Sequence, residues 1–397
     1  MDVQQTPAAD VSAPVLVTGG TGYLARWCIS ELLERGFTVH TTVRDLSREE
    51  GLRSVFPAAD GTGRLRVFAA DLLRDDGWKE AADGCGHVLH VASPLPPSEP
   101  KDPDELVIPA RDGTLRVLRA AFAGGARRVV VTSSSSAVRN SGGPRLGRPL
   151  TEDDWSDLDN PRLGAYAISK TIAERATWDY ASSAGATDRL VVVNPGAIIG
   201  PLLGADRSYS LQTVARLLDG DFPALPRLGF AFVDVRDVAD LHLRAMTAPE
   251  AAGQRFLGAG EFLWLTDVAA ILHAELGRDA SKVPTRRAPN ALVRLIALFD
   301  QGIRPVLPDL GQRSDYSTQK ARTLLGWTPR PARDSIVDCA RAILAARPAS
   351  SPGSATALRN LRGRFLRPGW GARVCCRVFP RKPQSHRCAS SMVINPS

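Results

Sequence analysis

The strongest constraint on the fold is a glycine-rich string that joins a strand-like run to a helix-like run. Residues 15–17 are apolar and lead into Thr18-Gly19-Gly20-Thr21-Gly22-Tyr23-Leu24-Ala25, and residues 24–34 have the spacing of an amphipathic helix. Gly19 permits a tight turn, Gly22 lets the backbone approach a pyrophosphate, and Ala25 lets the helix pack close to the strand. The amides of the helix N-terminus would then face the phosphates. The string therefore predicts a dinucleotide-binding loop.

Strand-like and helix-like segments alternate through the first half of the chain. Further strand-like runs cover residues 38–43, 65–68, 88–91, 129–131 and 190–193, and long helix-like segments cover 106–122 and 163–181. This alternation predicts a parallel sheet with helices on both faces, and near-continuous apolar strands agree with burial on both faces. The predicted fold class is α/β, a doubly wound parallel sheet (Rossmann fold) over residues 14–195.

The pattern is looser after Pro195. Loops rich in Pro and Gly cover 200–209 and 221–230, and shorter helices are expected at 267–275, 291–299, 318–325 and 335–345. We interpret residues 196–346 as mostly a smaller, partly interleaved substrate domain, with some segments returning to the Rossmann domain. Residues 1–13 form a polar lead. Residues 347–397 have no periodicity and are expected to be a basic, disordered tail.

The net charge of +8 comes from this tail, which contains ten Lys or Arg and no Asp or Glu, so residues 1–346 hold 40 basic and 42 acidic side chains. Clustered arginines can bind nucleic acid, but the tail has no reader motif, and no such partner is expected. The chain has no apolar run of about 18 residues and no signal-peptide pattern, which predicts a cytoplasmic protein without a membrane span. Cys28 and Cys85 are expected to be buried, and cysteine spacing predicts no metal site.

A candidate acid–base pair lies in the segment 163–181. Tyr166 and Lys170 are four residues apart, one turn along a helix. A fixed ammonium beside a phenol favours the phenolate, which suits the tyrosine to proton transfer near neutral pH. Upstream, the run at 129–131 leads into Thr132 and four consecutive serines. A serine at the carboxyl end of a central strand faces the ligand crevice and can donate a hydrogen bond to a carbonyl.

The end of the second strand indicates which dinucleotide binds. An acidic residue there accepts the ribose hydroxyls of NAD, whereas an arginine suits the 2′-phosphate of NADP. Arg44 is the candidate, Arg48 could assist, and Asp45 could cap the next helix or contact a ribose. NADP(H) is favoured, with NAD(H) as the alternative. Asp71 and Leu72 follow the third strand, where the adenine edge would lie; the alternative for Asp71 is a simple turn.

These features together resemble the extended short-chain dehydrogenases/reductases of the NAD-dependent epimerase/dehydratase superfamily, over roughly residues 14–345. Other strings resemble the dihydroflavonol 4-reductase branch, which also holds cinnamoyl-CoA reductases and microbial aldehyde and ketone reductases. These strings are Thr41-Thr42-Val43-Arg44-Asp45, His90-Val91-Ala92-Ser93-Pro94, Thr132-Ser133-Ser134, Asn194-Pro195-Gly196, Phe232-Val233-Asp234-Val235-Arg236-Asp237-Val238-Ala239 and Leu325-Gly326-Trp327-Thr328-Pro329.

The resemblance implies an enzyme, an NADPH-dependent reductase acting on the carbonyl of a small ketone, aldehyde or dihydroflavonol-like substrate. It implies three catalytic residues: Tyr166 donates the proton, Ser134 holds the carbonyl oxygen, and Lys170 supports the tyrosine and bonds the nicotinamide ribose. With the motifs above, the expected cofactor-binding residues are Gly19, Thr21, Gly22, Tyr23, Leu24, Arg44, Asp71, Leu72, Ala92, Tyr166, Lys170, Pro195 and Ile198.

Alternatives stay open. Within enzymes, a sugar-nucleotide epimerase or dehydratase that uses NAD, or a hydroxysteroid dehydrogenase, would carry similar motifs. The non-enzymatic alternative is a dinucleotide-sensing regulatory protein, although such sensors commonly lack the Tyr/Lys pair. His90 is expected to be structural, and His242 near Asp237 and Asp240 to be helix-surface charge and not a metal ligand. Loops at 94–103, 139–148 (with Asn140), 201–209 and 222–230 are expected to shape the pocket, and the protein to be a monomer or homodimer.

Overall fold

The computed structural model describes residues 11–59, 61–94, 100, 102–139, 147–204, 209–299 and 307–347. The chain divides after Arg347, and the predicted basic tail from residue 348 onward lies outside the described residues. So do Asn140 and parts of three of the loops expected to shape the pocket.

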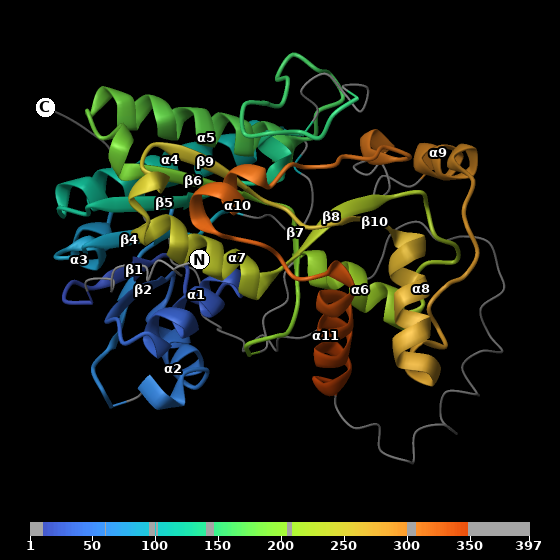
Figure 1. The fold of residues 1–397 in the computed structure, drawn as a ribbon, viewed down its shortest axis with the longest axis horizontal. Coiled ribbons are helices and arrows are strands. Elements are labelled where there is room, and N and C mark those ends of the chain that lie inside the picture. The colour runs from blue at the N-terminus through green and yellow to red at the C-terminus, as the bar shows by residue number, and fades with distance from the viewer. Residues whose placement is uncertain are drawn as a thin grey trace, which may run out of the picture. The chain divides into compact units, whose positions relative to one another are not determined.

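Seven parallel strands form the main sheet, in the order β3-β2-β1-β4-β5-β6-β9 (Figure 1). Their bounds are β1 Val15–Val17, β2 Val39–Val43, β3 Leu65–Ala69, β4 His87–His90, β5 Arg128–Thr132, β6 Leu190–Pro195 and β9 Gln254–Gly258. The order reverses direction between β1 and β4, and ligands of such sheets bind at this point, beside the carboxyl ends of the strands. The predicted doubly wound fold is confirmed.

The central strands of the main sheet bury both of their faces. In β1, Val15 and Val17 enter one core with helices α1 (Tyr23–Glu34) and α7 (Val235–Thr247). Leu16 enters a second core with α3 (Trp78–Ala82), α4 (Asp104–Ala123) and α5 (Ala165–Ser183). Successive side chains of a strand point to opposite faces, so a sheet covered by helices on both sides needs strands that are apolar throughout.

A smaller sheet has the order β10-β8-β7, with β7–β8 parallel and β8–β10 antiparallel. Its strands are β7 Ala197–Ile199, β8 Gly229–Asp234 and β10 Phe262–Trp264. The remaining helices are α2 Glu49–Arg53, α6 Tyr209–Asp219, α8 Leu265–Leu276, α9 Asn290–Phe299, α10 Gln319–Leu325 and α11 Ala332–Ala345. After β7 and β8, helix α7 and strand β9 return to the main sheet. The division of the chain near residue 195 stays a prediction.

None of the described helices is long and apolar enough to cross a membrane. Cys28 and Cys85 are buried, as predicted; Cys339 is buried as well, and all three are free thiols.

Candidate functional site

The glycine loop after β1 fits closely against two neighbouring strands. Gly19 has a φ of 71°, and a Cβ there would lie 3.0 Å from the Cβ of Ala92 after β4. A Cβ at Gly20 would lie 2.3 Å from Oγ1 of Thr41 in β2. A larger residue at either position would have to displace β2 or the chain after β4. The sequence marks Gly19 as the turn residue, but the need for Gly20 follows only from the approach of Thr41.

Helix α1 begins directly after this loop. Its N-cap is Gly22, which has no side chain to cover the amides of the first turn, and a Cβ at Gly22 would lie 3.1 Å from the carbonyl oxygen of Gly19. Free amides and the dipole at a helix N-terminus favour a bound anion. The other residues predicted for the pyrophosphate, Thr21, Tyr23 and Leu24, lie in the loop and this first turn. The loop therefore fits a dinucleotide phosphate.

Thr18 and His90 join the carboxyl ends of β1 and β4. The Thr18 hydroxyl oxygen accepts hydrogen bonds from the amides of Val91 and Ala92, both at 3.0 Å, and lies 2.9 Å from Nδ1 of His90. Burial, with a smaller effect from the charge of Lys170, lowers the pKa of His90 to about 3, so the ring is neutral at pH 7. The prediction of a structural histidine is confirmed. No sequence argument assigned a role to Thr18.

Two charged residues follow β2. Asp45 caps the short 3-10 helix η1 (Leu46–Arg48), because its Oδ1 accepts a hydrogen bond from the amide of Ser47 at 2.8 Å. This bond to the amide lowers the pKa of the Asp45 carboxyl. The sequence left two roles open for Asp45, a helix cap and a ribose contact. In the structure it is the cap of η1. Arg44 is exposed at the end of the strand, and its contact with a 2′-phosphate, assisted by Arg48, stays a prediction.

The pair predicted for the adenine edge lies in the turn after β3. Oδ1 of Asp71 accepts a hydrogen bond from the amide of Leu73 at 3.0 Å, as in an Asx turn. Leu72 packs against α4, where a Cβ at Gly113 would lie 2.8 Å from the Leu72 Cβ. Both residues thus shape the turn, and their contact with a cofactor stays a prediction.

Pro195 and Ile198 lie on the segment that connects the two sheets. Pro195 is buried at the end of β6, and Ile198 is half-buried in β7. A Cβ at Gly196, between them, would lie 2.3 Å from the carbonyl oxygen of Ala231 in β8. This close approach holds the segment at the carboxyl edge of the main sheet, where it was predicted to line the nicotinamide.

Tyr166 and Lys170 lie one turn apart on α5, as predicted. The lysine Nζ is 6.0 Å from the centroid of the tyrosine ring. Their exposure differs: 38% for the tyrosine and 8% for the lysine. An accessible phenol above a buried, fixed ammonium can exchange a proton with a bound ligand.

The serines after β5 differ in what their hydroxyls contact. Ser133 donates its proton to a carboxylate of α5, Glu174, at 2.6 Å, and the Ser135 hydroxyl is hydrogen-bonded to Tyr316. Oγ of Ser134 accepts a bond from the amide of Ser136 at 3.1 Å, a bond that does not use the Ser134 O–H proton. The turn that follows, η3 (Ser135–Ala137), packs against α5. Ser134 therefore keeps an O–H donor next to the helix of Tyr166.

Sequence reasoning missed Glu174, one turn beyond Lys170. Its carboxylate is 1% exposed and accepts hydrogen bonds from Ser133, Asn194 and Arg255. A glutamate among the polar positions of a helix gives no signal of burial, and its arginine partner is 81 residues away in the chain. The contact is visible only once β9 lies beside β6.

A small cavity connects the end of β4 with α5. Its volume is about 20 Å³, and Ala92, Ser133, Lys170 and Glu174 are among the residues that line it. A polar cavity of this size can hold about one water molecule. Ala92, predicted for the cofactor, and Lys170, predicted for catalysis, thus border the same space.

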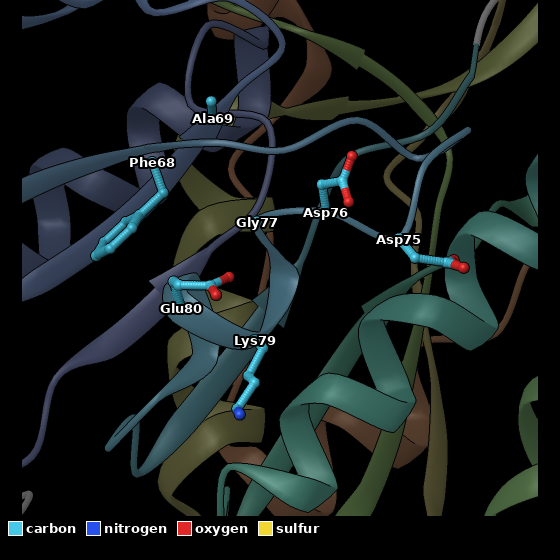
Figure 2. Close-up of a pocket in the computed structure, with 7 residues that line it drawn as sticks. All are labelled: Phe68, Ala69, Asp75, Asp76, Gly77, Lys79 and Glu80. Carbon is cyan, nitrogen blue, oxygen red and sulfur yellow. The ribbon is translucent and has the colours of Figure 1, made fainter.

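A larger hollow of about 500 Å³ shares no lining residue with the predicted site. Figure 2 shows its lining from the end of β3 to α3, which comprises Phe68, Ala69, Asp75, Asp76, Gly77, Lys79 and Glu80. Two of its carboxylates already have ion-pair partners, Asp75 with Arg116 and Asp76 with Arg74. We therefore place the candidate site at the glycine loop and α5.

His242 corrects one prediction. It is fully buried on α7, with Nδ1 2.7 Å from the carbonyl oxygen of Val238 and Nε2 2.8 Å from the hydroxyl of Thr132. Burial lowers its pKa to about 4. Asp237 is also buried and pairs with Arg330. The prediction of surface charge was wrong for both residues, because His242 faces Thr132 of β5 and Asp237 contacts Trp327 and Arg330 after α10. Among the described residues, no group of three His, Cys, Asp or Glu could hold a metal ion.

Known proteins resemble this chain in sequence. The model of the NAD dependent epimerase/dehydratase family matches residues 15–257. Cinnamoyl-CoA reductase 1 of Arabidopsis thaliana is 39% identical over 256 residues, which cover 62% of this chain and 72% of that protein. Dihydroflavonol 4-reductase of Hordeum vulgare is 33% identical over 250 residues, which cover 61% of this chain and 69% of that protein.

One solved structure with the same fold is the yeast methylglyoxal/isovaleraldehyde reductase Gre2 complexed with NADPH. It matches with a TM-score of 0.71 over 84% of this chain and 98% of that chain, at 24% identity. At that identity the match shows the fold alone.

Proposed function

The chain belongs to the NAD-dependent epimerase/dehydratase family, and from this membership we propose that it reduces the carbonyl of a small ketone, aldehyde or dihydroflavonol-like molecule with NADPH. It is a nicotinamide-dependent oxidoreductase, and relatives more than 30% identical are reductases of carbonyl compounds by name. The observation that carries the proposal is the pair Tyr166 and Lys170 on α5, beside the strand end where Ser134 keeps an O–H donor.

The glycine loop would hold the cofactor through the amides of α1, and Arg44 would select the 2′-phosphate of NADPH. Gre2, which has the same fold, carries NADPH in its solved structure. The bound nicotinamide supplies the hydride. The amides of Gly19 and Gly20 are bonded to Thr42 and the amide of Gly22 to Gly19, so the pyrophosphate would bind to the first-turn amides of α1, which no side chain of Gly22 caps.

The chain's own residues do the rest of the chemistry. Ser134 donates a hydrogen bond to the carbonyl oxygen and stabilises the negative charge that develops there. Tyr166 donates the proton to that oxygen. Lys170, buried one turn below, favours the phenolate that the tyrosine leaves behind.

Replacing the proton donor tests this proposal. NADPH oxidation with a panel of aldehydes, ketones and dihydroflavonols first identifies the best substrate. Tyr166→Phe should then lower kcat by about a hundredfold to ten-thousandfold, the contribution of a positioned general acid, while the Kd for NADPH changes by less than about twofold. Tyr180→Phe, fourteen residues along the same helix, is the matched control and should keep full turnover. Normal turnover in Tyr166→Phe would refute the role of the tyrosine.

A further inference from the structure

We propose that Glu174 is a positioning residue, which holds the strand end of Ser134 in register with the helix of Tyr166 and Lys170. Its carboxylate is not among the proposed reacting groups and acts through Ser133 and Asn194. The catalytic consequence rests on the proposed function. The structural consequence rests on the hydrogen bonds alone.

Glu174 ties one helix to three adjacent strands. Its Oε2 accepts a hydrogen bond from the hydroxyl of Ser133, just after β5, at 2.6 Å, and from Nδ2 of Asn194 in β6 at 2.7 Å. Its Oε1 accepts a bond from Nε of Arg255 in β9 at 2.6 Å. Strands β5, β6 and β9 are consecutive in the sheet. One carboxylate therefore fixes the position of α5 relative to all three strands.

Arg255 balances the buried charge. Its guanidinium lies 3.7 Å from the centroid of the Trp155 ring, and its NH1 donates to the backbone carbonyls of Glu152 and Asp154. A buried ion pair costs more desolvation than an apolar pair of the same volume, and Nη2 of Arg255, which has no partner among the described residues, adds to that cost. An apolar pair of similar volume could fill the same space without charge. The ion pair points instead to a need for directed contacts here.

Asn194 extends the carboxylate's reach to Ser134. Its Nδ2 also donates to the backbone carbonyl oxygen of Ser134 at 3.2 Å. Both neighbours of this nitrogen are acceptors, so the orientation of the amide is determined by them. The cost is that Oδ1 of Asn194, fully buried, has no partner among the described residues. An unpaired buried acceptor is unfavourable, so the two bonds from Nδ2 must outweigh it.

The same helix carries the other half of the site. Tyr166, Lys170 and Glu174 follow one another at intervals of four residues along one face of α5. The chain Glu174–Asn194–Ser134 thus sets where the serine O–H lies relative to the tyrosine. Catalysis is sensitive to this distance, since a misplacement of about 1 Å can lower the rate about a hundredfold.

Glu174→Gln breaks this chain in a predictable way. The carbonyl oxygen of the new glutamine must face Arg255, because the arginine has only donors. The NH2 group of the glutamine then takes the place of Oε2. Ser133 can adapt, because a hydroxyl both donates and accepts. Asn194 cannot, because its Nδ2 would meet a second donor. Rotating its amide would place Oδ1 against the carbonyl oxygen of Ser134. In either orientation of the Asn194 amide, the connection from residue 174 through Asn194 to Ser134 is broken.

Steady-state kinetics tests the catalytic consequence. Glu174→Gln and Asn194→Ala should each lower kcat by about tenfold to a hundredfold, with the KM for NADPH within about twofold. Asn194→Ala keeps the Glu174–Arg255 pair, so it still tests the positioning role if Glu174→Gln does not fold. The matched control is Asp237→Asn, which also converts a buried carboxylate beside an arginine to an amide, on α7. It should keep kcat within about twofold. Wild-type kcat in a folded Asn194→Ala would overturn the proposal.

Amide hydrogen exchange tests the structural consequence without any substrate. The amides of Ser136 and Ala137 bond to the side chain and carbonyl of Ser134, so both variants should speed exchange in a peptide covering residues 132–138, and Asp237→Asn should not. Unchanged exchange in both variants would overturn the positioning role. If the wild-type protein turned over no carbonyl compound but the exchange result held, the proposed function would fail and the positioning role would stand.

Discussion

Ser134 differs from its serine neighbours in the direction of its hydrogen bonds. Ser133 gives its proton to Glu174, and Ser135 is bonded to Tyr316, whereas Ser134 accepts a bond and keeps a proton to donate. Four consecutive serines cannot be distinguished by residue type. They are distinguished by partners that come from α5 and from the segment near residue 316.

This difference predicts unequal effects of two alanine substitutions. Ser134→Ala removes a donor to the developing charge on the substrate oxygen and should lower kcat by about a hundredfold to a thousandfold. Ser135→Ala, the matched control, should leave kcat within about threefold. Steady-state turnover with the best carbonyl substrate measures both. The reverse order of the two losses would assign the oxygen-binding role to Ser135.

At the scale of elements, we predict that the end of β2 sets the preference for one dinucleotide over the other. The cap that Asp45 makes to η1 turns its carboxylate to the Ser47 amide and leaves Arg44 as the exposed charge directly at the strand end. An arginine in this place favours a phosphate over ribose hydroxyls.

Arg44→Ala should therefore weaken NADPH binding by about tenfold or more, the value of a hydrogen bond between charged groups, and change NADH binding by less than about twofold. Fluorescence titration with each dinucleotide measures the two Kd values. Arg35→Ala, at the opposite end of α1 from the glycine loop, is the control for a general effect of charge. Equal losses for NADPH and NADH would remove Arg44 as the phosphate ligand.

The strands of the main sheet could be predicted from the sequence where their apolar runs are unbroken, as in β1 and β6. β9 was not predicted, because it lies in the half of the chain where the alternating pattern is looser, and its Arg255 is buried only through Glu174 of a distant helix. β7 and β10 have three residues each, too few for periodicity to be visible. In the site, the glycine loop and the Tyr/Lys spacing are local signals. Glu174 and Gly20 act through contacts across the sheet, which a linear pattern does not carry.

At the scale of the whole molecule, the proposed site depends on two buried histidines that anchor strand ends. His90 bonds to Thr18 at the end of β1, and His242 accepts a bond from Thr132 at the end of β5. Thr18 directly precedes the glycine loop and Thr132 directly precedes the serines, so protonating either ring would change a hydrogen bond next to the proposed site. The same two groups couple the stability of the fold to pH.

Both histidines have folded-state pKa values, about 3 and about 4, below the ordinary value of 6.5. As pH falls below about 6.5, the unfolded chain takes up a proton on each ring and the folded chain does not. The free energy of unfolding should therefore fall with decreasing pH, by about 1.4 kcal/mol per pH unit for each histidine, until about pH 4 for His242 and about pH 3 for His90. Urea unfolding followed between pH 7.5 and pH 4 measures this slope.

His242→Gln should be less stable at pH 7.5 but lose less stability on acidification, and the difference between the two slopes separates His242 from the carboxylates that titrate in both proteins. Identical slopes for the wild-type protein and His242→Gln would show that His242 is charged or not buried in the folded protein.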